Sequence, residues 1–300
     1  MTRFVRGGGD MLLIIALSSI LGLFIGSFLN VVADRLCQEK GFLKGRSVCD
    51  SCGKELKPAH LVPILSYISL KGRCAYCKQK VSLYYPFAEL LTAVFFGVAA
   101  YSSNFAVSPT PLTGLRFVYL AIVFSVFAII FLSDLKYQII PNQVVYFGII
   151  FVFLVQVGSL GFWAYKYHNM LQSDALGTYL LKGDFYKDSV MREVKSFGYN
   201  VGAGLGICLF FYLLVVLTKE RGMGGGDVKL GLLIGLFNGF PNGIIAVFLG
   251  FISGSLVSVG LILFSRKSLK DVVPFGPFLI LGSVLSLLYG NWIFTRYISF

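Results

Sequence analysis

Eight apolar runs occupy half of this chain of 300 residues, and they restrict its fold more than any other feature. A helix needs roughly 20 apolar residues to cross about 30 Å of hydrocarbon. These runs are continuous rather than alternating, which excludes the strands of a membrane barrel. Hydrophobic residues make up 56% of the chain and charged residues 13%. We therefore expect an all-α polytopic membrane protein with about eight spans, at 11–31, 86–101, 116–133, 143–161, 198–217, 228–241 (short), 243–264 and 275–294.

Basic residues lie in the segments between these runs. The net charge of +12 could suggest a nucleic-acid partner. However, lysine and arginine beside apolar spans are typical of the side of a membrane protein that stays inside the cell, so we expect no nucleic acid. The stretch from Arg35 to Lys80 is especially basic, and we place it in the cytoplasm. Alternation then puts 134–142, 218–227 and 265–274 on the same side and makes 162–197 an external loop.

These boundaries predict four parts. Residues 1–10 are a basic, glycine-rich extension that resembles a leader, and 11–34 form the first transmembrane helix. Residues 35–84 form a small cytoplasmic domain, and 85–300 form the main transmembrane domain. Basic residues in 1–10 fit poorly on the outer side, so one hypothesis is that Met11 is the native start.

Two pairs of cysteines lie in the cytoplasmic segment, as CDSC and CAYC. Each C-x-x-C pair can fold into a tight turn that presents two thiolates, and two such turns complete a tetrahedral zinc site. The rival interpretation is a pair of disulfides or a redox centre, which a reducing cytoplasm disfavours. We predict that Cys49, Cys52, Cys74 and Cys77 hold a structural Zn²⁺, whereas Cys37 and Cys208 pack as small apolar side chains.

Two acids at the ends of predicted spans suggest catalysis. A carboxylate at the centre of a membrane helix costs about 2.5 to 3.5 kcal/mol, and less near an end, so each needs a reason. Asp134 ends the third span, and Asp227 follows three glycines in RGMGGGDVKL. By alternation both lie at the cytoplasmic face. The non-catalytic interpretation is that an acid at such a place only caps a helix end at the membrane interface.

Two carboxylates at one site share a proton, so one serves as general base on water while the other donates to the scissile carbonyl. This is the chemistry of an aspartyl protease. Gly224, Gly225 and Gly226 carry no side chain, so a peptide backbone could approach Asp227 closely.

The same residues resemble the type IV prepilin leader peptidase and N-methyltransferase family of intramembrane aspartyl proteases. The resemblance runs from GSFLNVVADRL (26–36) through the double C-x-x-C segment and YPFAELLTA to DLKYQIIPN and the G-x-G-D signature at Gly224, Gly226 and Asp227. It implies that Asp134 and Asp227 are the catalytic pair. It also implies that the four paired cysteines bear zinc in the domain associated with methyl transfer.

Members of this family cut the basic leader from prepilins at the cytoplasmic face of the bacterial inner membrane, and most then methylate the new N-terminus with S-adenosylmethionine. The resemblance thus implies type IV prepilins or pseudopilins as substrates, a multi-pass place in the lipid bilayer, and a role for Glu89 in methyl transfer. A polar packing contact is the other interpretation of Glu89. Two alternatives stay open: a leader peptidase without methyltransferase activity, and a transporter or scaffold with a zinc-bearing loop.

Overall fold

A computed structural model describes residues 8–38, 47–49, 51–173, 175–219, 223–263 and 273–297. Within these ranges the chain is nearly all helical, with no strand, which confirms the predicted all-α class. By contacts it divides into two compact units, Met1–Pro141 and Asn142–Phe300. The first unit contains α1 (Gly8–Cys37), the 3-10 helix η1 (Pro58–Leu61), α2 (Leu65–Ser69), α3 (Tyr84–Ser102) and α4 (Pro111–Tyr137). The second contains α5 (Asn142–Gln172), α6 (Ala175–Lys182), α7 (Asp184–Thr218), α8 (Gly225–Asn238), α9 (Asn242–Leu263) and α10 (Gly276–Tyr297).

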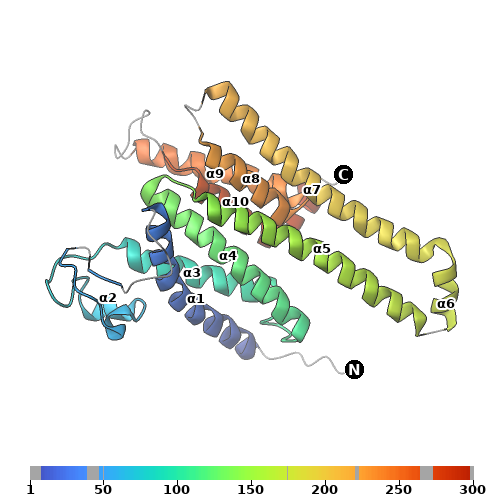
Figure 1. Cartoon of the computed structure of the whole chain (residues 1–300), viewed down its shortest axis with the longest axis horizontal. Coiled ribbons are helices and arrows are strands. Elements are labelled where there is room, and N and C mark those ends of the chain that lie inside the picture. Colours follow the sequence, from blue (N-terminus) through green and yellow to red (C-terminus); the bar gives the residue numbers. More distant parts are fainter. Residues whose placement is uncertain are drawn as a thin grey trace. The chain divides into compact units, whose positions relative to one another are not determined.

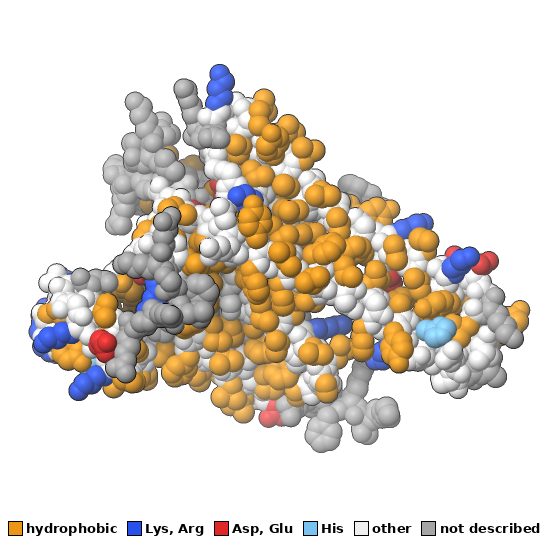
Figure 2. Space-filling model, in the orientation of Figure 1, with side chains coloured by type: hydrophobic (Ala, Val, Ile, Leu, Met, Phe, Trp, Pro, Cys, Tyr) orange, Lys and Arg blue, Asp and Glu red, His pale blue; other side chains and the backbone are white. Residues whose placement is uncertain are grey.

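Seven of the described helices, namely α1, α3, α4, α5, α7, α9 and α10, are long and apolar enough to cross a membrane. The eighth apolar helix, α8, has 14 residues and is only about 21 Å long. Large apolar side chains such as Leu154, Leu205 and Leu209 are more than half exposed, as lipid-facing residues must be. Figure 2 shows such side chains over α5 and α7, with lysine and arginine gathered over the loop that contains α2. The chain is a multi-pass membrane protein.

Small residues bring α1 and α3 into close contact within the first unit. Gly22 and Gly26 form a G-x-x-x-G pair on α1, a spacing that places both on one helix face. A Cβ added at Gly22 would lie 2.7 Å from the carbonyl oxygen of Thr92, and one at Gly26 would lie 2.9 Å from Cβ of Thr92. A larger side chain at either position would therefore separate the two helices. Figure 1 shows α2 and its loop beside the end of α1 and the start of α3.

Glycines also set the packing of α7 and α8 in the second unit. A Cβ added at Gly235 would lie 2.6 Å from Cα of Gly204, so the two backbones touch at this point. Two side chains then fasten α8 to its neighbours. The Gln156 amide of α5 donates to the carbonyl oxygen of Leu236 at 2.6 Å, and the Asn238 amide donates to Ser283 of α10 at 2.6 Å.

The stretch 162–197, expected as an external loop, is mostly helical in its described residues, and its external position stays a prediction. Helix α5 continues to Gln172, α6 follows, and α7 begins at Asp184. Figure 1 shows α6 joining α5 and α7 at one end. With 31 and 35 residues, α5 and α7 are about 46 and 52 Å long. Because hydrocarbon is only about 30 Å thick, the charged ends of both helices extend beyond it.

The predicted N-terminal parts are described only in part. Residues 1–7 of the expected extension lie outside the described residues, and Gly8 to Asp10 already belong to α1. That helix continues to Cys37, three residues beyond the predicted end at 34. The cytoplasmic domain expected at 35–84 accordingly begins with the last turn of α1.

Candidate functional site

The two cysteine pairs form matching turns. In each turn the backbone N–H and carbonyl of the first cysteine bond to residues just after the second cysteine. The residues that flank each turn form a short antiparallel bridge. The first turn has Cys49 N–H to Lys54 (3.0 Å), Gly53 N–H to Cys49 (2.8 Å) and a bridge between Val48 and Glu55. The second has Cys74 N–H to Gln79 (2.9 Å), Lys78 N–H to Cys74 (3.2 Å) and a bridge between Arg73 and Lys80.

These turns bring four sulfur atoms together. The Sγ atoms of Cys49, Cys52, Cys74 and Cys77 all lie within 4.8 Å of one another, and those of Cys49 and Cys77 are 3.9 Å apart. Zn–S bonds of about 2.3 Å in a tetrahedron place sulfur atoms about 3.8 Å apart. All six cysteines of the chain are free. The cluster can therefore hold a metal ion, and its four thiolates fit tetrahedral zinc.

The thiols of the second turn differ in acidity. Backbone N–H groups of Cys77 and Tyr76 lower the pKa of the Cys74 thiol to about 6. At Cys77 the Gln79 backbone N–H acts in the same direction, but desolvation and the neighbouring thiols outweigh it and raise the pKa to about 11. A bound cation removes that difference, since thiolates are the ligands of zinc and metal binding releases their protons.

One residue after each pair has a left-handed backbone. Gly53 has φ of 67°, and Lys78, at the same place in the second turn, has φ of 60°. A Cβ added at Gly53 would meet nothing within 4 Å. Glycine is therefore favoured here by the left-handed backbone and not by lack of space for a side chain. Only the second turn bears the cost of a side chain in this region, which is about 1 to 2 kcal/mol.

We expect Lys78→Gly to stabilise the metal-bound loop by about 1 kcal/mol, because glycine adopts positive φ without strain. The reciprocal change Gly53→Lys should destabilise it by a similar amount. Chelator concentration at half release of zinc measures both effects. The matched control is Lys54→Gly, outside the left-handed region. A loss of stability in Lys78→Gly would contradict the assignment of strain to this residue.

Asp134 lies near the end of α4. Its side chain is 6% exposed, and its backbone carbonyl accepts the N–H of Gln138 at 3.0 Å. Gln138 has φ of 54° and ends the helix in a left-handed cap. The C-terminal end of α4 is therefore fixed one helical turn after Asp134.

Asp227 lies in the first turn of α8, three residues into a helix that begins earlier than the predicted start at 228. Its side chain is 9% exposed, and its Oδ2 accepts the backbone N–H of Gly224 at 3.3 Å. A Cβ added at Gly225 would meet nothing within 4 Å. The glycine run therefore leaves open space in front of the first turn. Asp134 belongs to the first compact unit and Asp227 to the second, so their pairing stays a prediction.

Lys136, two residues after Asp134, is held by α1 and by three tyrosine rings. Its Nζ lies 2.8 Å from Oδ1 of Asp34, an acid that the Tyr137 hydroxyl also contacts at 3.1 Å. The ammonium lies 4.9, 5.6 and 5.1 Å from the ring centroids of Tyr84, Tyr85 and Tyr137. Cation–π attraction adds to the ion pair at such distances. The pair fastens the end of α4, and with it Asp134, to α1.

Lys229 is held in a comparable way inside the second unit, two residues after Asp227. Its Nζ donates to Oδ1 of Asn142 at 2.7 Å and lies 5.3 Å from the ring centroid of Tyr146. This contact ties the N-terminal part of α8 to the first turn of α5. Sequence reasoning missed both anchors, because Lys136 and Asp34 are 102 positions apart and Lys229 and Asn142 are 87 apart.

Glu89 lies on α3 and is 9% exposed. Its carboxylate contacts the segment between α1 and α3 that contains the four paired cysteines, called here the cysteine-bearing loop. Its Oε2 accepts the backbone N–H of Ile64 at 2.8 Å. Ser27 of α1 hydrogen-bonds to the same carboxylate. Its expected role in methyl transfer stays a prediction.

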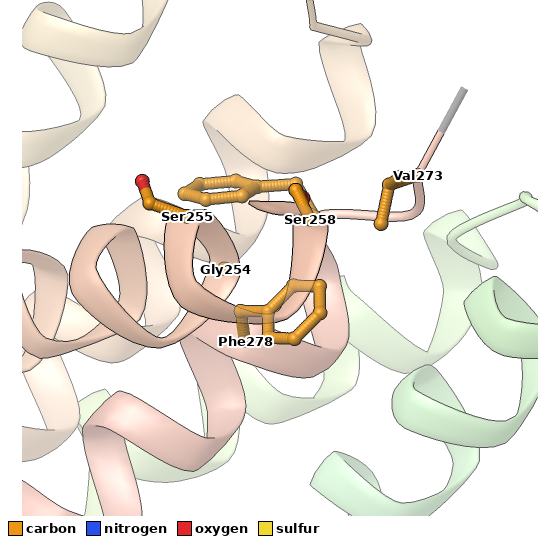
Figure 3. A pocket seen from close by; sticks show the side chains of 6 residues that line it. Gly254, Ser255, Ser258, Val273 and Phe278 are labelled. Atoms are coloured by element: carbon orange, nitrogen blue, oxygen red, sulfur yellow. The ribbon is translucent and has the colours of Figure 1, made fainter. Parts of the chain in front are cut away.

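A pocket elsewhere in the second unit includes none of the predicted site residues. Its volume is about 230 Å³. Figure 3 shows Phe278 of α10 beside Gly254 of α9 at this place. A Cβ at Gly254 would lie 3.4 Å from that ring, which is an ordinary van der Waals contact. The lining residues are Gly254, Ser255, Ser258, Val273, Phe275 and Phe278.

Two family models match this chain, in two separate regions. The bacterial peptidase A24 N-terminal domain matches residues 20–103, which include α3 and all four paired cysteines. The type IV leader peptidase family matches residues 121–259, which include Asp134 and Asp227. Both matches agree with the resemblance that the sequence motifs indicate.

Curated relatives match over nearly the full chain. A protein of Bacillus subtilis named prepilin leader peptidase/N-methyltransferase is 29% identical over 93% of this chain and 96% of its own. Proteins of the same name from Pseudomonas putida and Pseudomonas aeruginosa are 28% and 26% identical, over 93% and 94% of this chain and 92% of each relative. No solved structure matches the chain significantly.

Proposed function

We propose that this member of the type IV leader peptidase family cleaves the basic leader from type IV prepilins or pseudopilins and then methylates the new N-terminal amine. The observation that carries the proposal is a buried carboxylate at a helix end in each unit, Asp134 on α4 and Asp227 on α8. The setting is the bacterial inner membrane, with the site at its cytoplasmic face. That placement is supported by the basic segment 35–80, which begins where α1 ends.

Chain connectivity supports a shared site for the two acids. Only residues 138–141 join the end of α4 to the start of α5, and a link that short spans at most about 17 Å. Within the second unit, Asn142 at the start of α5 is hydrogen-bonded to Lys229 in the first turns of α8. This short connection is compatible with the proposed pairing of Asp134 and Asp227.

The ends of the helices favour different roles for the two acids. A helix N-terminus carries partial positive charge and a C-terminus partial negative charge. Asp227 in the first turn of α8 is suited to act as the ionised base that activates water. Asp134, in the last turn of α4, is suited to act as the protonated acid. Asp134 donates its proton to the carbonyl oxygen while Asp227 takes one from the attacking water. As the C–N bond breaks, the leaving amine takes the proton held by Asp227, and Asp134 recovers one from the diol intermediate.

The glycines before Asp227 give the substrate access. Open space at Gly225 matches the need for an extended backbone to lie against the first turn of α8. Helices resist cleavage because their peptide groups are already hydrogen-bonded within the chain. A substrate must therefore present an unwound segment here.

We expect Gly225→Ala to keep or raise thermal stability and to raise KM for a prepilin by about tenfold or more, because the added methyl group occupies the approach to Asp227. Stability is measured by the melting temperature in detergent, and KM by leader release. Gly206→Ala on α7 is the matched control, since its added Cβ also meets nothing within 4 Å. An unchanged KM in Gly225→Ala would contradict the proposed access path.

Methyl transfer is assigned to the first unit. The four paired cysteines hold Zn²⁺, which stabilises a loop too small to form its own core. S-adenosylmethionine is the co-substrate: the unprotonated N-terminal amine bonds to its methyl carbon, the C–S bond breaks, and the sulfur keeps the electron pair as a thioether. The amine loses one proton to solvent.

Mass spectrometry of a prepilin incubated with the purified protein and S-adenosylmethionine tests both activities at once. We expect loss of the leader and a mass gain of one methyl group on the mature fragment. Leader loss without methyl gain would support a peptidase that lacks methyl transfer. An intact prepilin under conditions where the protein is folded would refute the proposal and favour a transporter or scaffold.

A further inference from the structure

A buried carboxylate outside the proposed acid pair, Glu89, contacts the cysteine-bearing loop. Glu89 lies where α1 and α3 pack closely, since a Cβ added at Gly26 would lie 3.0 Å from Cα of Glu89. Its carboxylate is 9% exposed and receives hydrogen bonds from Ile64 N–H and from Ser27. These two bonds use about half of the roughly four acceptor positions of the carboxylate.

The residue that Glu89 contacts has a strained backbone. Ile64 has φ of 59° and ψ of −49°, and the N–H of Leu65 bonds to the carbonyl of Pro63 across it. This is a γ-turn of the rare positive-φ kind, in a β-branched residue that strongly disfavours it. Such strain costs about 1 to 3 kcal/mol and persists only where the surroundings impose it. The hydrogen bond from Ile64 to Glu89 is one such restraint.

A series of contacts then leads from Ile64 to the metal cluster. Ile64 precedes α2, whose Tyr67 hydroxyl donates to the carbonyl of Val81 at 3.2 Å. Val81 N–H bonds to Gly72 at 2.8 Å, and Gly72 lies two residues before Cys74. The ring of Tyr76, between Cys74 and Cys77, also packs against His60 with centroids 5.5 Å apart.

We propose that Glu89 is a positioning residue for methyl transfer: it anchors the cysteine-bearing loop to the junction of α1 and α3 through the amide of Ile64. The inference rests on the proposed methyltransferase activity. It differs from a catalytic role, because an anchor requires only an acceptor oxygen at this place, whereas orienting an ammonium or removing its proton requires the negative charge.

Two substitutions separate these roles. Glu89→Gln keeps an acceptor oxygen for Ile64 and removes the charge, and Glu89→Leu removes both. We expect Glu89→Gln to methylate a pre-cleaved pilin within about threefold of the unmodified protein, and Glu89→Leu to be slower by about 10- to 100-fold, because small misplacements remote from the chemistry have effects of this size. Adding Ile64→Gly to Glu89→Leu should recover part of the loss, since glycine accepts positive φ without an anchor.

Three further measurements show that the variants are folded and test the contact itself. Leader cleavage and zinc content should stay unchanged in all three variants. Amide exchange at Ile64 should be faster in Glu89→Leu than in Glu89→Gln, and this readout does not depend on any activity.

The outcomes discriminate between the proposals. Equal loss of methylation in Glu89→Gln and Glu89→Leu would overturn the anchor in favour of a catalytic carboxylate. Full methylation in Glu89→Leu, or unchanged exchange at Ile64, would overturn it as well. If the unmodified protein cleaves but never methylates, the proposed methyl transfer fails, and the exchange measurement alone then decides whether Glu89 anchors the loop.

Discussion

Replacing either acid of the proposed pair, as Asp134→Asn or Asp227→Asn, is expected to reduce leader cleavage by about 10²- to 10⁴-fold, which is the usual contribution of general acid–base catalysis. The asparagine keeps the shape of the side chain and can neither activate water nor supply the proton. Alanine should give the same loss. Because each carboxylate is nearly buried, asparagine is the cleaner change. Release of leader from a synthetic prepilin measures the rate.

The control is Asp188→Asn, an exposed acid on α7 that should leave cleavage unchanged. Both active-site variants should still methylate a pilin whose leader has already been removed, because that step does not use the acid pair. Cleavage retained in either single variant would remove that residue from the pair. Loss of methylation on the pre-cleaved pilin would indicate damage to the fold instead.

Membrane helices were the most predictable part of this fold. An apolar run of sufficient length leaves no choice but a helix in hydrocarbon, where every backbone group must bond within its own segment. The four cysteines were similarly predictable, because the C-x-x-C spacing alone forms the turn. Glycine at position 53 indicates a left-handed backbone in the first turn, whereas lysine at position 78 does not indicate one in the second turn.

The stretch 162–197 shows where hydropathy stops being informative. Its interleaved charges indicate only that it leaves the membrane. Beyond the hydrocarbon a helix can continue if side chains pack locally, as the stacked rings of Trp163 and Tyr167 do, with centroids 5.0 Å apart. Tyr167 also stacks on Tyr186 of α7. A polar segment between two membrane spans can therefore be helical.

The anchors around the proposed site could not be predicted because they depend on contacts far apart in the sequence. No sequence pattern links Asp34 to its partner Lys136 on α4. Ile64 carries no sequence signal for positive φ, which favours glycine or asparagine. Such departures from local preference are expected where a fold is constrained for function.

The second large effect is expected from loss of the metal ligands. Cys74→Ser should lower zinc affinity by more than about 100-fold, since changes in residues that only support the ligands already cost 10- to 100-fold. Cys74 is the buried member of the cluster, and its Sγ accepts the N–H of Tyr76 at 3.5 Å, so the second turn should loosen together with the metal. Methyl transfer should fall with zinc content.

Cleavage provides the decisive comparison for Cys74→Ser. The acid pair lies outside the loop, so leader release should fall far less than methylation, and protease should cut the loop of the variant first. Cys208→Ser on α7 is the matched control and should keep zinc, because that thiol lies in the other compact unit. Zinc measured by atomic absorption and methyl gain by mass spectrometry give the two readouts. A variant that loses zinc and still methylates fully would separate the metal from methyl transfer and leave it a purely structural ion.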